Sequence, residues 1–266
     1  MKETTKNILL TDRDINALLE VSRHKMITSM QLAKLCYSDI SYETSRKRLR
    51  RLHKADILAT SSLNDSHSRG RPDLIYYLTE FGKKHIEPYV VSKKIINYGL
   101  KNVYQRDVFL KIVEVRLNLV NACQKNLISN LKFYDFKEYI FLNSEFDTKY
   151  KFICDAICTF SDKNSNNFFV AIKYDTKSLQ LQKHYIPIFE YTLKHNLMTW
   201  IICSNWERIN SLITDFFSQL NISEKNTDRI LMSTISEFRE KELKQSIFKK
   251  LNGELTSLKY LKSIKV

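Results

Sequence analysis

Cationic side chains crowd one stretch of the chain, residues 41–54, whose sequence is SYETSRKRLRRLHK. Six of these fourteen residues are Lys or Arg, and only one is acidic. Placed on a helix at about 100° per residue, Ser45, Leu49 and Leu52 share a narrow face, with Arg48 on its flank. Most of the remaining cations lie roughly opposite. Such a surface is either a solvated helix face or one that binds phosphate groups.

The composition bears on this choice. The 266-residue chain carries 43 Lys and Arg against 29 Asp and Glu, a formal net charge of +14, which favours a polyanionic partner, either nucleic acid or an acidic membrane surface. No apolar run reaches the roughly 18 to 20 residues that span a bilayer, so we expect a cytoplasmic protein without membrane contact. Five cysteines without a CxxC pair and six scattered histidines indicate no disulfide framework, metal site or cofactor.

The elements that must position the cationic stretch can be read from the first ninety residues. Thr11 and Asp14 form a variant capping box at the start of the first helix, and Thr28 or Ser29 caps the second. After the third helix the periodicity changes from helical to extended on both sides of a polar turn, and a further helix stops before Pro88. The predicted elements are helices over residues 11–23, 28–36, 41–55 and 79–87 and strands over 57–60 and 74–78.

The order helix, helix, helix, strand, turn, strand is that of a winged helix-turn-helix, which we assign to residues 1–91. Its third helix would lie in the major groove, with Glu43 placed to accept from cytosine N4. The turn NDSHSRGRPD would form an arginine-tipped wing that reaches the minor groove or flanking phosphates, although such a tip is often only a solvated turn. The residues expected to contact DNA are Tyr42, Glu43, Arg46, Lys47, Arg50, Arg51, Lys54, Arg69 and Arg71.

The second half of the chain, residues 92–266, has a different pattern. One or two helices up to about residue 123 are followed by three strands, a helix and a further strand. This order resembles the core of the PD-(D/E)xK, or restriction-endonuclease-like, fold, so the expected class is α+β with an α/β second domain. The predicted elements are strands over 132–142, 150–160, 168–174 and 198–203 and helices over 177–193, 209–220 and 234–251.

The resemblance to that fold implies a specific chemistry. Its members hold Mg²⁺ with an acid on one strand and a second acid on the next, and a lysine two residues further on orients water and the scissile phosphate. Asp155 matches the first acid and Lys173 the lysine, but Ala171 occupies the position of the second acid. We therefore expect no enzymatic activity and interpret Asp155 and Lys173 as an ion pair. The alternative is a Mg²⁺-dependent DNA endonuclease that uses both residues with a relocated acid, Asp175 or Glu114.

Several segments together resemble the replication-relaxation family of plasmids and integrative elements. They are LTDRDINALLEV, SRKRLRRLHKADIL, GRPDLIYYLTEFG, CDAICTF, FFVAIKYDTKSLQLQKHYIPIFEY and MTWIICSNWER. The resemblance implies a mobile-element protein that binds a specific duplex site, such as a transfer or replication origin or an operator. We expect a homodimer that binds double-stranded DNA in conjugative transfer, DNA replication or transcription regulation, with a relaxase or replication protein as a further partner. A scaffold whose winged helix binds protein is the remaining alternative.

Overall fold

The chain divides into two compact units, Met1–Val113 and Glu114–Val266. The first unit extends beyond residue 91, where the sequence suggests a boundary, and the division falls inside helix α5 (Arg106–Gln124). Helices dominate the first unit and a mixed sheet the second, so the predicted α+β class is confirmed. The computed structural model describes residues 8–62, 74–97, 99, 105–142, 154–176, 181–195, 197–219, 228–240 and 247–257.

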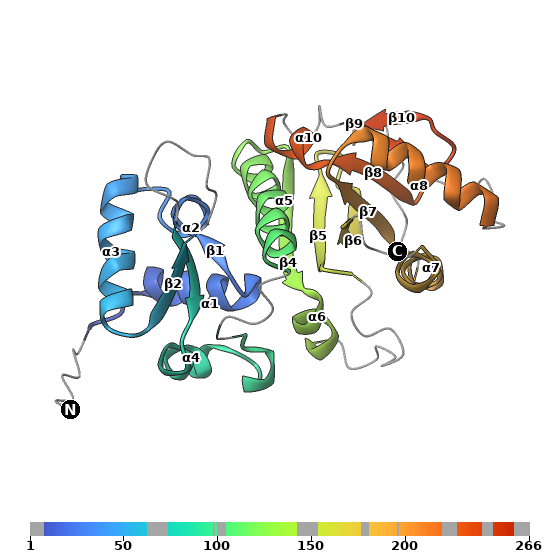
Figure 1. Ribbon diagram of the computed structural model, residues 1–266. Helices are drawn as coiled ribbons and strands as arrows, with labels where there is room; N and C mark the ends of the chain where they lie inside the picture. Colours follow the sequence, from blue (N-terminus) through green and yellow to red (C-terminus); the bar gives the residue numbers. More distant parts are fainter. Residues whose placement is uncertain are drawn as a thin grey trace. The chain divides into compact units, whose positions relative to one another are not determined.

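Side-chain caps set where the first helices of unit 1 begin. The Thr11 side chain accepts from the Asp14 amide at 3.2 Å, and the Asp14 carboxylate accepts from the Thr11 amide at 2.8 Å, which completes a capping box. Thr28 and Gln31 repeat this arrangement at the second helix. The elements of unit 1 (Figure 1) are α1 (Asp12–His24), β1 (Ile27–Thr28), α2 (Ser29–Cys36), α3 (Tyr42–Lys54), β2 (Leu58–Ser62), β3 (Leu74–Leu78), α4 (Glu80–Ile86), η1 (Glu87–Tyr89) and η2 (Lys93–Ile95).

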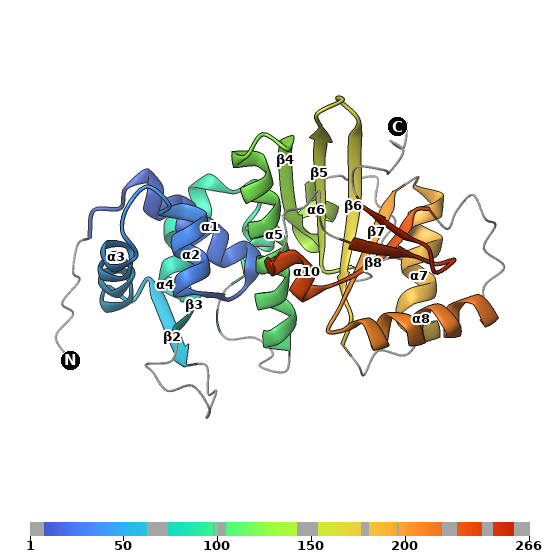
Figure 2. The same ribbon diagram turned by 90° about the horizontal axis from the view of Figure 1, so that it is seen from above.

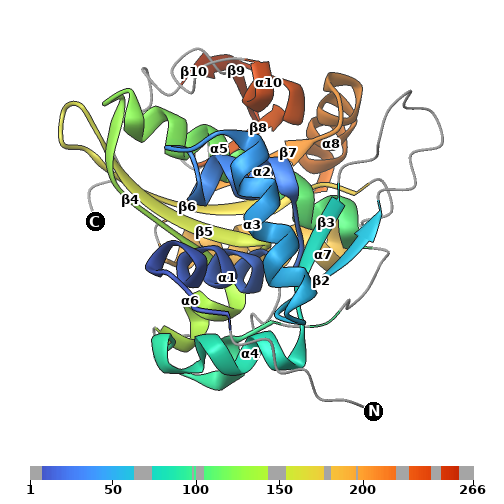
Figure 3. The ribbon, with the colours of Figure 1, turned by 90° about the vertical axis from the view of Figure 1, so that its left-hand side faces the viewer.

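The helices of unit 1 pack with a small antiparallel sheet. Its described strands run in the order β1-β3-β2, with Leu58 opposite Leu78. In sequence and in space α2 and α3 are neighbours, and α3 also contacts β2 (Figure 3). Helix α4 approaches the chain before β2 so closely that a Cβ added at Gly82 would stand 2.1 Å from the carbonyl oxygen of Ile57. The predicted order of three helices and two strands is therefore present.

Unit 2 is organised around a larger sheet. Its described strands run in the order β10-β9-β8-β7-β6-β5-β4, in which β6, β7 and β8 are parallel and the other pairs antiparallel. The predicted order of a helix, three strands, a helix and a strand is found in α5, β4, β5, β6, α7 and β7. The elements after α5 are β4 (Ile128–Asp135), α6 (Phe136–Leu142), β5 (Ala156–Asp162), β6 (Asn167–Tyr174), α7 (Leu181–Lys194), β7 (Met198–Cys203), α8 (Trp206–Gln219), β8 (Ile230–Thr234), α10 (Ile235–Glu240), β9 (Ile247–Lys250) and β10 (Leu255–Ser257).

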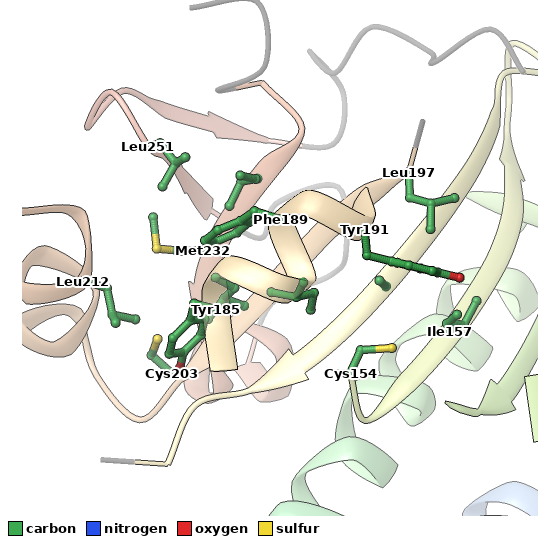
Figure 4. Packing of buried hydrophobic residues seen from close by; sticks show 14 of the residues in the cluster. Cys154, Ile157, Tyr185, Phe189, Tyr191, Leu197, Cys203, Leu212, Met232 and Leu251 are labelled. Atoms are coloured by element: carbon green, nitrogen blue, oxygen red, sulfur yellow. The ribbon is translucent and has the colours of Figure 1, made fainter. Parts of the chain in front are cut away.

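Both faces of this sheet are covered. On one face, helices α7 and α8 pack onto the central strands (Figure 2), and Tyr185, Phe189 and Leu212 join strand residues in a buried apolar cluster (Figure 4). Because successive residues of a strand point to opposite faces, Trp200 belongs to the other face, where it contacts the ring of Phe238 on α10. The parallel strands are buried on both sides, which explains their largely apolar sequences.

Two predicted elements are wrong. The segment 132–142 is not one strand, because β4 ends at Asp135, whose carboxylate accepts from the Glu138 amide at 2.7 Å and so caps α6. The segment 234–251 is not one helix, since it holds the last residue of β8, the short α10 and strand β9.

Within the described ranges, we find no helix with both the length and the apolar character that crossing a membrane requires.

Candidate nucleic-acid interface

Helix α3 is fixed to its unit by the narrow face that the sequence predicts. Ser45, Leu49 and Leu52 are fully buried. The Ser45 hydroxyl donates to the Tyr42 carbonyl at 2.7 Å, so this polar side chain is satisfied within its own helix. The Ser41 side chain caps the helix by accepting from the Thr44 amide at 3.2 Å. The cationic residues are consequently left on the remaining surface of the helix.

Three of the predicted phosphate-binding residues are exposed on that surface. Lys47, Arg51 and Lys54 are all exposed, and no acid pairs with them in the part of the chain that the structure describes. They are free to meet an external anion. The two wing residues, Arg69 and Arg71, lie outside the described residues, so their predicted role has no structural counterpart here.

The other predicted contact residues on α3 form a small cluster around Glu43. The Glu43 carboxylate accepts from the Arg46 guanidinium at 3.0 Å and lies 4.0 Å from that of Arg50. The Arg46 guanidinium stands 5.6 Å from the centre of the Tyr42 ring, and the Tyr42 hydroxyl is hydrogen-bonded to Ser29 of α2 at 2.8 Å. The structure thus brings together Tyr42, Glu43, Arg46 and Arg50, while their contact with DNA stays a prediction.

Arg48 has a different role from the other cations of α3. Its Nε donates to the Asp14 carboxylate at 2.8 Å, a second nitrogen donates to the same carboxylate, and that nitrogen also donates to the Leu9 carbonyl at 2.8 Å. The bond to Asp14 raises the pKa of the Arg48 guanidinium. The sequence placed Arg48 only on the flank of the narrow buried face of the helix. Its partner is 34 residues away, a separation that helical periodicity does not reveal.

Asp14 is the centre of this buried network. Besides Arg48, its carboxylate accepts from the Thr11 hydroxyl at 2.7 Å and from the Tyr37 hydroxyl at 3.1 Å. Burial opposes the charged form, but the hydrogen bonds from Arg48 and Thr11 prevail and lower the pKa of Asp14. Burial and the neighbouring carboxylate raise the pKa of Tyr37. Asp14 is therefore a charged group that ties α1, the end of α2 and α3 together.

The two residues with a possible catalytic chemistry form an ion pair in unit 2. Lys173 Nζ lies 3.1 Å from the Asp155 carboxylate, which also accepts from the Tyr174 amide at 2.8 Å. Ala171, at the position of the missing acid, is fully buried in the apolar cluster beneath α7. Ala171 is therefore surrounded by apolar side chains, among them Ile157.

Asp175, considered as a relocated acid, is held by other groups. Arg208 of α8 donates to both of its carboxylate oxygens, at 2.8 and 3.1 Å, and the Tyr185 hydroxyl donates to one of them. The bond to Asp175 raises the pKa of Arg208, and burial raises that of Tyr185. Glu114 lies half-buried on α5. Among the described residues, no three His, Cys, Asp or Glu side chains are arranged to hold a metal ion.

Comparison with known proteins gives one match. No curated relative and no similar solved structure was found. The model of the replication-relaxation family matches residues 18–126, which begin within α1 and end just after α5. The matched region includes all of α3 and its exposed cations. Over residues 18–126 the chain is thus similar to the replication-relaxation family, which is the family that the sequence resembles.

Proposed function

We propose that the protein is a sequence-specific binder of double-stranded DNA that acts in the replication, transfer or transcription of a plasmid or another mobile element, with α3 as its recognition helix. The observation that carries the proposal is the division of α3 into a narrow buried face and a cationic surface. On that surface Lys47, Arg51 and Lys54 have no acid partner in the described structure. The family match supports the replication-related setting.

The arrangement suits a helix that enters the major groove. Exposed Lys and Arg side chains neutralise phosphates and release counterions, which supplies affinity that does not depend on sequence. Arg46 and Arg50 have the fork geometry that matches the O6 and N7 acceptors of guanine. Helix α2 would act as the supporting helix of the helix-turn-helix, and its Ser29 holds the Tyr42 hydroxyl in place.

Unit 2 would serve as a non-catalytic body. We take Asp155 and Lys173 as a structural ion pair, because the lysine ammonium is already bonded to the carboxylate and Ala171 is packed among apolar side chains. The partially buried pair neutralises both charges inside the fold. Dimerisation and recruitment of a relaxase or replication protein are the further roles proposed for this unit.

The DNA-binding proposal is tested by selection from a randomised 24-base-pair duplex library, followed by affinity measurements across salt concentrations. We expect a defined consensus site for the wild-type chain. Lys47→Ala and Arg51→Ala should each weaken binding to all sequences alike, and each should reduce the slope of log affinity against log salt by about 1, the value for one phosphate contact.

Lys163→Ala is the matched control, because it removes the same charge from an exposed position in the turn after β5. It should leave the salt slope unchanged. Loss of the same magnitude in Lys163→Ala would show that only the total charge matters and would overturn the role of α3. A wild-type chain that enriches no sequence would overturn specific binding.

A further inference from the structure

Apart from Arg48, which is bonded to Asp14, the Lys and Arg residues of α3 fall into two groups that differ in their surroundings. Lys47, Arg51 and Lys54 have no described acid partner, whereas Arg46 and Arg50 share the carboxylate of Glu43. The three paired residues are spaced i, i+3 and i+7, so they lie along one stripe of the helix. The charge available to an incoming phosphate is therefore lower at this stripe than on the rest of α3.

Glu43 is bonded to an arginine that neighbouring side chains hold in position. The Arg46 guanidinium that binds it also stands over the Tyr42 ring, and the Tyr42 hydroxyl is bonded to Ser29 of the neighbouring helix. More than half of the Glu43 side chain is exposed. An exposed ion pair of this kind adds little to folding stability. The ion pair therefore matters mainly for the binding of a ligand to this surface of α3.

Duplex DNA of arbitrary sequence offers this stripe only phosphates. A phosphate repels the Glu43 carboxylate and must compete with it for Arg46 and Arg50. A G·C base pair in the major groove offers a full exchange, because guanine O6 and N7 accept from an arginine while cytosine N4 donates to a carboxylate. Only a G·C pair offers two adjacent acceptors on one base for an arginine together with a donor for the carboxylate.

We propose that Glu43 is the specificity-determining residue of α3, which weakens binding to DNA of arbitrary sequence and selects sites with a G·C pair opposite the start of the helix. The inference rests on the proposed function, since it assumes that α3 enters the major groove. It assigns two effects to one acid: a cost imposed on DNA of the wrong sequence and a base contact at the correct site.

The test compares wild type with Glu43→Gln, which keeps the size of the side chain and removes its charge. Each chain is used in full length for selection from the randomised duplex library and for affinity measurements on the best selected duplex and on a pooled random duplex. Glu43→Gln should bind the random duplex on the order of fivefold more tightly, and its ratio of specific to random affinity should fall about tenfold, the loss of one base contact. The G·C preference at one position of the consensus should disappear.

Glu80→Gln is the matched control, because Glu80 is also an exposed acid of unit 1 paired with a cation three residues on, Lys83 at 3.5 Å. It should behave as wild type. Equal changes in Glu80→Gln and Glu43→Gln would reduce the effect to net charge and overturn the inference. So would a Glu43→Gln consensus and affinity ratio identical to those of wild type. Failure of the wild-type chain to enrich any sequence would instead remove the proposed function itself.

Discussion

At the scale of single residues, Asp14 has a larger structural role than the sequence predicts. Sequence periodicity identifies it as part of a helix cap, and it does fill that role with Thr11. The same carboxylate also binds Arg48 and Tyr37, so that a local capping residue is at once a long-range tie between helices. A charge this deeply buried is costly unless every acceptor position is used, and here several donors converge on it.

Asp14→Asn should destabilise the protein by about 3 kcal/mol, because it removes the buried charge with which the half-buried Arg48 guanidinium is paired. The measurement is urea unfolding at neutral pH. Asp12→Asn, which removes an exposed acid from the same turn, should change stability far less. A loss no greater in Asp14→Asn than in Asp12→Asn would contradict the role of the network.

The same residue predicts a pH dependence. Since the pKa of Asp14 is lower in the folded than in the unfolded state, its contribution is fully present above the unfolded value of about 4 and is lost as the pH falls toward the folded value. Wild type should therefore lose more stability than Asp14→Asn when unfolding is followed from pH 6 down to the acid limit. Parallel curves for the two proteins would contradict this assignment.

At the scale of elements, the close contact of α4 with the chain before β2 reverses an ordinary expectation. Replacement of a helical Gly by Ala normally stabilises a helix by about 1 kcal/mol. At Gly82 the new Cβ would collide with the Ile57 carbonyl, a backbone atom that cannot rotate away. Gly82→Ala should therefore lower the melting temperature of the protein.

Lys84→Ala is the control for this change, since it also places Ala in α4 but at an exposed position. It should leave the melting temperature nearly unchanged. A Gly82→Ala protein as stable as wild type or more so would show that α4 can move away from Ile57 without cost.

Elements with strong local signals were predictable, and those defined by tertiary contacts were not. The bounds of α1 and α3 follow from caps at Thr11 and Ser41 and from regular apolar spacing. Strand β7 follows from a short apolar run. The short apolar run of β8 is equally consistent with a helix, and only its pairing with β7 decides in favour of a strand. The cap at Asp135 was hidden within what read as one continuous strand.

The candidate site was predicted to a similar extent. The surface position of Lys47, Arg51 and Lys54 follows from helical periodicity alone, and the structure agrees. Periodicity also placed Glu43 on the cationic side, but not its bonds to Arg46 and Arg50, because long side chains can reach several partners. The tie between Arg48 and Asp14 depends on how α1 packs beside α3, which no local pattern contains.

At the scale of the whole molecule, the chain combines a region that matches the replication-relaxation family model with a unit built on a mixed sheet. We expect no cleavage by this sheet unit. Supercoiled plasmid incubated with the protein and Mg²⁺ or Mn²⁺ should remain supercoiled, because Lys173 is bonded to Asp155 and Asp175 is bonded to Arg208. Nicking that disappears in both Asp155→Ala and Lys173→Ala would reverse this conclusion and make the protein an endonuclease.

The fastening of α3 has a practical consequence for protein engineering. The helix is held by Ser45, Leu49, Leu52 and Arg48, which are not assigned to DNA, and by the Tyr42 hydroxyl, which is bonded to Ser29. A combinatorial library that keeps these five positions constant can vary the other outward ones without disturbing the scaffold. Helix α3 could in this way be redesigned to bind other DNA sequences while the residues that anchor it stay unchanged.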